Sequence, residues 1–236
     1  MGQGTRASLL LCLVLATALA TPGCLSFRTA HVPDKFLEGP GGNGWERVEN
    51  KSMAEPESEW MGFKKTQVLT YQDRAAGGPG YPGTLTLVTL RAPTTYSPDT
   101  LKDLIKDQVR TRAEASGLKI QGDPIEGTRT LSNGAESQYF VYTANVTQTG
   151  FFTAKDAGAK IVGEVWNCAD AKTSVIAVGF AQVNARSTTA GITLPGAAPG
   201  GSRGADPATW REIVADKDGS IDGHKGERGL IWNIAC

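Results

Sequence analysis

Residues 84–117 read TLTLVTLRAPTTYSPDTLKDLIKDQVRTRAEASG, and this stretch carries the strongest structural signals in the chain. Residues 84–90 are threonine, leucine and valine in partial alternation, which is typical of a strand with one well-buried face. Pro93 ends this pattern, because proline cannot donate a ladder hydrogen bond. The first half of the stretch therefore predicts a strand that leads into a short loop.

The second half of the stretch predicts an amphipathic helix. Ser97 can cap free N–H groups, and Pro98 suits the first helical position. Gly117 suits the left-handed conformation in which many helices end. Most charged residues lie opposite an apolar stripe. We expect this long helix to cover a sheet with the stripe, which consists of Leu101, Leu104, Ile105, Val109 and Ala113.

The N-terminal residues have the features of an export signal. Arg6 precedes an apolar run, residues 9–20, which is too short for an ordinary transmembrane helix. Thr21-Pro-Gly-Cys24 resembles the end of a lipobox, the signal that directs a diacylglycerol group onto a cysteine. We therefore expect residues 1–23 to be a signal peptide. Cys24 would then carry palmitate-type acyl chains that anchor the lipoprotein on the extracytoplasmic face of the cell membrane.

The alternative is an ordinary secretory signal that is cut after Ala18 or Ala20 and leaves Cys24 as a free thiol. The mature chain lies outside the cytoplasm in both cases. An even pair of cysteines, Cys168 and Cys236, then remains in an oxidising compartment, and this predicts a disulfide. Two free thiols with a metal or redox role are the other possibility, but no Cys-x-x-Cys spacing or nearby histidine supports it.

Short strand patterns and turns fill the rest of the chain. Asn133-Gly134 is a strong tight-turn dipeptide, and Pro207 opens a short second helix over residues 206–215. The apolar residues 230–236 suit either a final strand or packing beneath that helix. The expected strands cover residues 67–71, 118–121, 128–131, 135–145, 160–166 and 173–183, and the last two must be antiparallel because their connection is short.

These elements predict one domain with tails. Residues 24–44 end in a glycine-rich run and are interpreted as a flexible, lipid-anchored spacer. Residues 45–236 form a single α+β domain with a low-complexity insert at 184–205. The predicted fold is an antiparallel sheet with one long helix and a shorter C-terminal helix packed on it.

This order of elements resembles the PsbP-like family, whose members include lipid-anchored envelope proteins. The resemblance is carried by the Gly44-Trp45 opening, the unit 84–117 and the strand series 134–183. It implies a PsbP-like sandwich and a largely non-enzymatic role in binding and assembly. It assigns no functional residue, because no shared site motif is visible.

Residues 216–227 partly match a calcium loop, the only cofactor site that the sequence suggests. Calcium requires hard oxygen ligands at alternate positions and a late glutamate. Ile221 stands where the loop needs a glycine, so the alternative is a surface turn rich in aspartate and glycine. The candidate ligands are Asp216, Asp218, Ser220, Asp222 and Glu227.

A serine nucleophile is the second chemical candidate. Gly200-Gly-Ser202-Arg-Gly204 matches the bare G-x-S-x-G pattern, which needs a strand directly before it and a helix directly after it. A flexible loop precedes Ser202 here, so the pattern lacks its structural context.

The sequence as a whole favours a non-catalytic, lipid-anchored extracytoplasmic binding or assembly module. Its expected partners are the membrane, through the anchor, and an envelope protein. Nucleic acid is excluded as a partner, because 24 basic and 24 acidic residues leave no basic footprint. The alternatives are a calcium-stabilised structural protein and a serine hydrolase that uses Ser202.

Overall fold

The computed structural model describes residues 29–39, 44–48, 59–60, 63–74, 82–91, 96–146, 157–169, 173–183 and 207–236. The strands are β1 (Trp45–Arg47), β2 (Glu59–Trp60), β3 (Phe63–Asp73), β4 (Thr84–Arg91), β5 (Leu118–Thr130), β6 (Glu136–Val146), β7 (Ala157–Asn167) and β8 (Thr173–Gln182). The helices are α2 (Asp34–Leu37), α3 (Pro98–Ala115) and α4 (Pro207–Val214).

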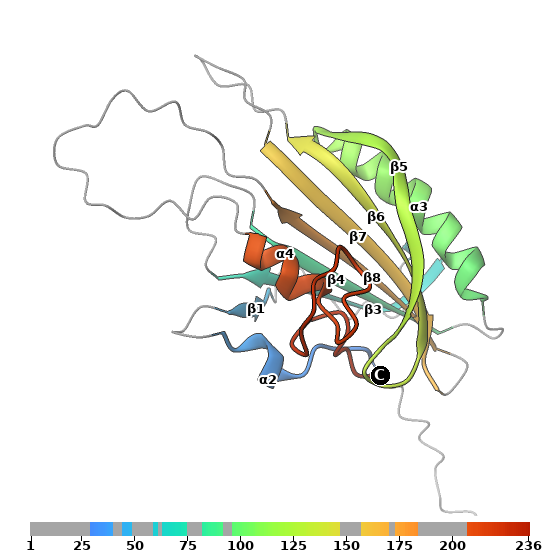
Figure 1. Ribbon diagram of the computed structural model, residues 1–236. Helices are drawn as coiled ribbons and strands as arrows, with labels where there is room; N and C mark the ends of the chain where they lie inside the picture. Colours follow the sequence, from blue (N-terminus) through green and yellow to red (C-terminus); the bar gives the residue numbers. More distant parts are fainter. Residues whose placement is uncertain are drawn as a thin grey trace, which may run out of the picture.

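The strands form an antiparallel sheet in the order β1-β3-β4-β8-β7-β6-β5, and β2 pairs with β3 outside this path. α3 packs on one face over β5, β6 and β7, whereas α4 and the C-terminal segment pack on the other face (Figure 1). Helices and an antiparallel sheet together confirm the α+β class.

The signals of residues 84–117 are confirmed as β4 and α3. Ser97 caps the helix, since its Oγ accepts a hydrogen bond from the Thr100 N–H at 3.2 Å. Gly117 follows the helix with a φ of +85°. The apolar stripe is buried except for Leu104, which is 40% exposed. The prediction was wrong for Leu104 because this residue lies on the flank of α3 that points away from β5.

β5 corrects the prediction of two short strands at 118–121 and 128–131. It is one strand, Leu118–Thr130, with a register shift between Gln121 and Ile125. The Gly-Asp-Pro sequence at 122–124 suggests a turn locally. At a sheet edge, however, an irregularity with a glycine at positive φ and a proline without an N–H is tolerated.

Residues 29–39, which we predicted within the spacer, belong to the folded part. Ala30 and Val32 are buried, and the Val32 N–H donates to the Tyr71 hydroxyl at 3.1 Å. His31 forms an antiparallel bridge with Ala235. The prediction failed because the glycine-rich run at 39–44 masked the short apolar pattern that precedes it. The first spacer residues, 24–28, lie outside the described residues.

The C-terminal residues pack into the core instead of adding a strand to the sheet. Leu230, Ile231 and Ile234 are buried in the apolar cluster that also contains α4. The disulfide between Cys168 and Cys236 is confirmed, and it joins positions 68 residues apart. Closing a loop of this length stabilises a fold by about 4 kcal/mol on the chain-entropy account. The bond holds the end of the chain at the β7–β8 hairpin.

Gly163 illustrates how tightly the α3 face is packed. It lies opposite Phe140 in the β6–β7 register, and the Phe140 ring occupies the space that a Cβ at position 163 would need. Phe140 is completely buried beneath α3, so its ring has little freedom to move.

We therefore expect Gly163→Ala to lower the free energy of unfolding by about 1–3 kcal/mol through overpacking. Urea unfolding followed by circular dichroism measures this change. Gly226→Ala is the matched control, because its new Cβ would meet only Ala215 at an ordinary 3.5 Å. Equal stability of the two variants would contradict this account of the packing.

Candidate functional site

Among the described residues, α3 covers only part of its face of the sheet, and a groove lies beside the helix. Lys102 and Lys106 reach Glu126 of β5 at 2.7 and 2.8 Å, which draws α3 toward the β5 edge of the sheet. The same face of β4 and β8 continues beyond the helix. There the paired residues Thr86 and Val178 are only partly buried.

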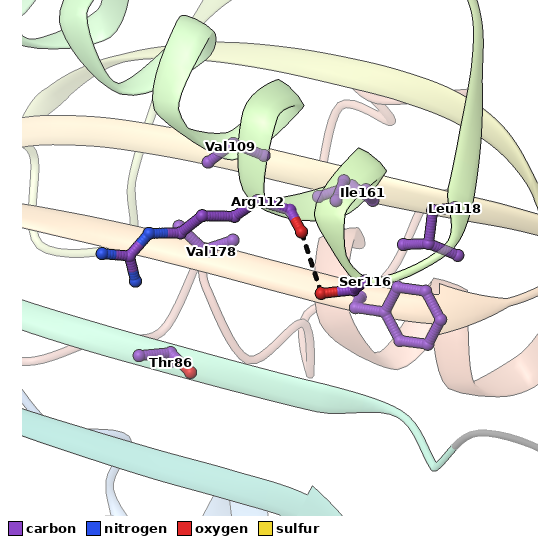
Figure 2. A pocket seen from close by; sticks show the side chains of 9 residues that line it. Thr86, Val109, Arg112, Ser116, Leu118, Ile161 and Val178 are labelled. Carbon is purple, nitrogen blue, oxygen red and sulfur yellow. Dashed lines mark hydrogen bonds between the residues drawn. The ribbon is translucent and has the colours of Figure 1, made fainter.

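A pocket of about 270 Å³ lies in this groove (Figure 2). Its floor is the sheet, with Thr86 from β4 and Val178 and Phe180 from β8. Its wall is the last half of α3, with Val109 and Ala113 facing the floor. Most of this lining is hydrocarbon, as is usual for sites that bind small molecules.

The polar groups of the pocket come from the end of α3. The Ser116 hydroxyl donates to the Arg112 carbonyl at 2.8 Å, so it is used within the helix end. The Arg112 side chain runs along the groove, and its guanidinium points away from Ser116 (Figure 2). Among the described residues that line the pocket, Arg112 is the only charged one.

A buried ionic cluster lies on the opposite face of the sheet. Arg129 of β5 forms a two-pronged pair with Glu164 of β7, with Nε–Oε1 at 2.9 Å and Nη2–Oε2 at 2.6 Å. Its Nη1 also donates to Asp216 Oδ2 at 2.8 Å. The three side chains are 1%, 0% and 3% exposed. This geometry joins the edge strand, the sheet centre and the C-terminal segment.

The Asp216 carboxylate also organises the backbone of the segment that follows it. Its Oδ1 accepts N–H hydrogen bonds from Asp218, Gly219 and Ser220 at 2.9, 2.6 and 3.1 Å. Burial raises the pKa of Asp216, but the bond from Arg129 and the backbone N–H groups outweigh burial and hold the pKa below its ordinary value. Asp216 therefore acts as an ionised structural anchor.

The structure gives the calcium candidates other partners. Asp216 faces Arg129, whereas Asp222 accepts hydrogen bonds from Lys160 at 2.6 Å and from the Trp210 indole at 2.9 Å. The carboxylates of Asp218 and Glu227 belong to exposed residues, and the Ser220 carbonyl accepts from Tyr139. Within the described ranges, no group of three or more His, Cys, Asp or Glu residues could hold a metal. Calcium binding stays a prediction that no contact here supports.

The other residues singled out in the sequence have different outcomes. Cys168 and Cys236 are brought together as a disulfide. Cys24 and Ser202 lie outside the described residues, as do the signal peptide and the insert at 184–205. Sequence reasoning missed Arg129, Glu164 and the groove around Arg112. No local pattern marks them, because their partners come from distant strands.

No family model, curated protein or solved structure matches the chain. In the part of the chain that the structure describes, no helix is both long and apolar enough to cross a membrane.

The lowered pKa of Asp216 predicts a specific loss of stability in acid. A carboxyl group whose pKa is lower in the folded state stabilises the fold above its unfolded pKa, near 4, and this contribution is lost as the pH falls through the folded pKa. Asp216→Asn should therefore cost about 1.5–3 kcal/mol at pH 7, the range for a hydrogen bond to a charged group. Its stability should also fall less steeply below pH 4.

Urea titrations between pH 2 and pH 7 measure both effects. Asp218→Asn is the control, because Asp218 is an exposed carboxylate in the same segment. A surface change of this kind should stay within about 0.5 kcal/mol. Wild-type stability that does not fall in acid, or two variants with the same pH profile, would count against the role given to Asp216.

Proposed function

We propose that the protein is a non-catalytic binding module, anchored by a lipid on Cys24 at the extracytoplasmic face of the cell membrane. We further propose that its ligand lies in the groove between α3 and strands β4 and β8. The observation that carries this proposal is the apolar pocket of about 270 Å³ on the partly covered face of the sheet.

The rigid surroundings of the pocket support binding. Its floor is made of central strands, and its wall is a capped helix whose stripe is buried against the sheet. A site that is already formed in this way loses little conformational freedom when a ligand enters. The pocket volume of about 270 Å³ suits one small apolar molecule. A stable protein partner would instead need a contact surface of about 800 Å² on each side.

The position of the N-terminal segment supports an anchor that leaves the groove accessible. The Ala30 N–H donates to the Thr89 hydroxyl near the end of β4, so the chain enters at that end of the sheet. Phe180 pairs with Thr84 at the opposite end of β4. Ala30 therefore lies at the end of the sheet away from the Phe180 side of the groove.

We also propose that the fold is a PsbP-like sandwich. α3 on one face and α4 on the other, with the sheet order given above, support this assignment. An envelope protein that delivers or receives the ligand is the partner that fits such a module.

Filling the groove should abolish binding of an apolar probe. We expect the neutral fluorophore N-phenyl-1-naphthylamine to bind the purified protein at one saturable site. Thr86→Trp places an indole on the pocket floor and should weaken this binding at least about tenfold, since the buried contacts are lost. Fluorescence titration measures the affinity.

Thr143→Trp is the matched control, because Thr143 is an exposed strand threonine outside the pocket lining. It should bind the fluorophore as the wild type does. Absence of saturable binding, or equal loss in the two variants, would overturn the groove as the site.

The anchor is tested by the intact mass of the protein from its native membrane, with and without reductant. We expect a chain of residues 24–236 plus acyl groups, and a gain of about two hydrogens on reduction of the Cys168–Cys236 bond. A soluble chain that starts near residue 20 would overturn the anchor and leave the groove proposal standing.

A further inference from the structure

Resting on the proposed function, we infer that the ligand of the groove is a long-chain carboxylate. Its carboxylate would bind the Arg112 guanidinium, and its alkyl chain would lie along Val178 and Phe180 toward Leu118. The observations behind this inference are the charge of the pocket, the direction of the Arg112 side chain and the apolar surface on either side of it.

The pocket combines one cation with hydrocarbon walls. Arg112 is the only charged residue among its described lining residues, and Val109, Val178 and Phe180 present apolar surface to the same space. Arg112 is exposed, so water screens part of its attraction for an anion. The apolar residues beside it supply the contact surface that a hydrocarbon chain needs. A ligand with one anionic group and one apolar chain matches this distribution.

The direction of Arg112 decides where the anionic group would lie. The last turn of α3 carries the negative end of the helix dipole, which repels an anion near Ser116. The Arg112 guanidinium points away from Ser116 and out over the Thr86–Val178 part of the floor (Figure 2). The anionic group is therefore placed away from the helix end, and the alkyl chain is left with the apolar end of the groove.

A carboxylate fits this site better than a phosphate. The planar guanidinium fork binds one carboxylate through two parallel hydrogen bonds. Such a carboxylate would use two of the five N–H donors of the guanidinium. A phosphate ester carries more charge and more acceptor oxygens. The hydroxyl groups of the lining are Thr86 and Ser116, and Ser116 already donates to the Arg112 carbonyl.

The alkyl chain is matched by apolar surface toward the far end of the groove. Ile161 and Phe180 on the floor and Leu118 beyond the end of α3 continue the lining. Leu118 and Phe180 are only partly buried, so a chain can remove more of their surface from water. Each methylene that becomes fully buried should tighten binding by about fourfold.

The test compares three ligands of equal chain length on the full-length purified protein. Dodecanoate, dodecanol and dodecyl phosphate each displace N-phenyl-1-naphthylamine in a fluorescence titration. We expect dodecanoate to bind up to about fivefold more tightly than dodecanol, because it adds a charge-assisted pair with the exposed Arg112. We expect dodecyl phosphate to bind more weakly than dodecanoate.

Arg112→Gln removes the charge and should bring the ratio of dodecanoate to dodecanol affinity down to about one, whatever the change in dodecanol binding itself. Arg112→Lys should retain part of the preference, since it keeps the charge without the fork. Lys217→Gln is the matched control, because Lys217 is an exposed cation on the C-terminal segment outside the pocket lining. It should behave as the wild type.

The outcomes separate this inference from the proposed function. Equal binding of dodecanoate and dodecanol by the wild type would overturn the inference and leave an apolar groove. Tighter binding of dodecyl phosphate would overturn the choice of a carboxylate. If none of the three ligands displaces the fluorophore, the inference fails while the groove stands on the fluorophore titration alone. If the fluorophore itself does not bind, both proposals fail.

Discussion

Arg129 connects three parts of the molecule that are far apart in the sequence: the edge strand β5, the central strand β7 and the segment after α4. Arg129 stands on the edge strand β5, and its guanidinium binds Glu164 at the sheet centre and Asp216 in the segment after α4. The Arg129 guanidinium also donates, at 2.6 Å, to the carbonyl of Val214, the last residue of α4. All three charged side chains are buried, so removing Arg129 would leave two carboxylates out of water without a cation. This contact joins α4 and the C-terminal segment to the sheet, together with the apolar cluster around Trp210 and the Cys168–Cys236 disulfide.

The two faces of the sheet differ in how they are covered. The Arg129 face is covered by α4, the C-terminal residues and the partly buried Phe36 and Leu37 of α2, and its cluster includes the buried Trp45, Trp166 and Trp210. A pocket of about 270 Å³ lies on this side too, beside α2, Trp45 and Leu230. On the other face, α3 is the one helix among the described residues. It is drawn toward β5, and Thr86 and Val178 beside it are only partly buried. Because one face of the sheet is well buried, that face fixes the strand register, and a groove on the other face does not disturb it.

Local signals in the sequence were sufficient for several elements. The cap at Ser97, the proline at the first helical position and the stripe of α3 predicted that helix. The short connection between the expected strands 160–166 and 173–183 predicted the β7–β8 hairpin. The even pair of cysteines left after the signal peptide predicted the disulfide. The helix and hairpin signals lie in residues that are close together in the sequence, and the disulfide prediction rests on an expected oxidising compartment.

The remaining features depend on tertiary contacts that no local pattern carries. Arg129 finds Glu164 and Asp216 across 35 and 87 residues. Gly122 and Pro124 read as a turn, yet β5 passes through them as an irregular edge strand. Leu104 belongs to the apolar stripe of α3 by spacing, but its exposure is set by where the helix sits on the sheet. The groove has the same origin, because it is defined by the offset of α3.

The bridge between the segment around His31 and the C-terminal tail has a mechanical consequence. His31 and Ala235 form a bridge at the end of the sheet, and the next residue, Cys236, is covalently bound to Cys168 at the tip of the β7–β8 hairpin. Tension applied through the N-terminal segment would therefore pass from residue 31 into the tail and from there into two central strands. A pull in this direction would be resisted by the middle of the sheet and would not peel strands one by one from an edge.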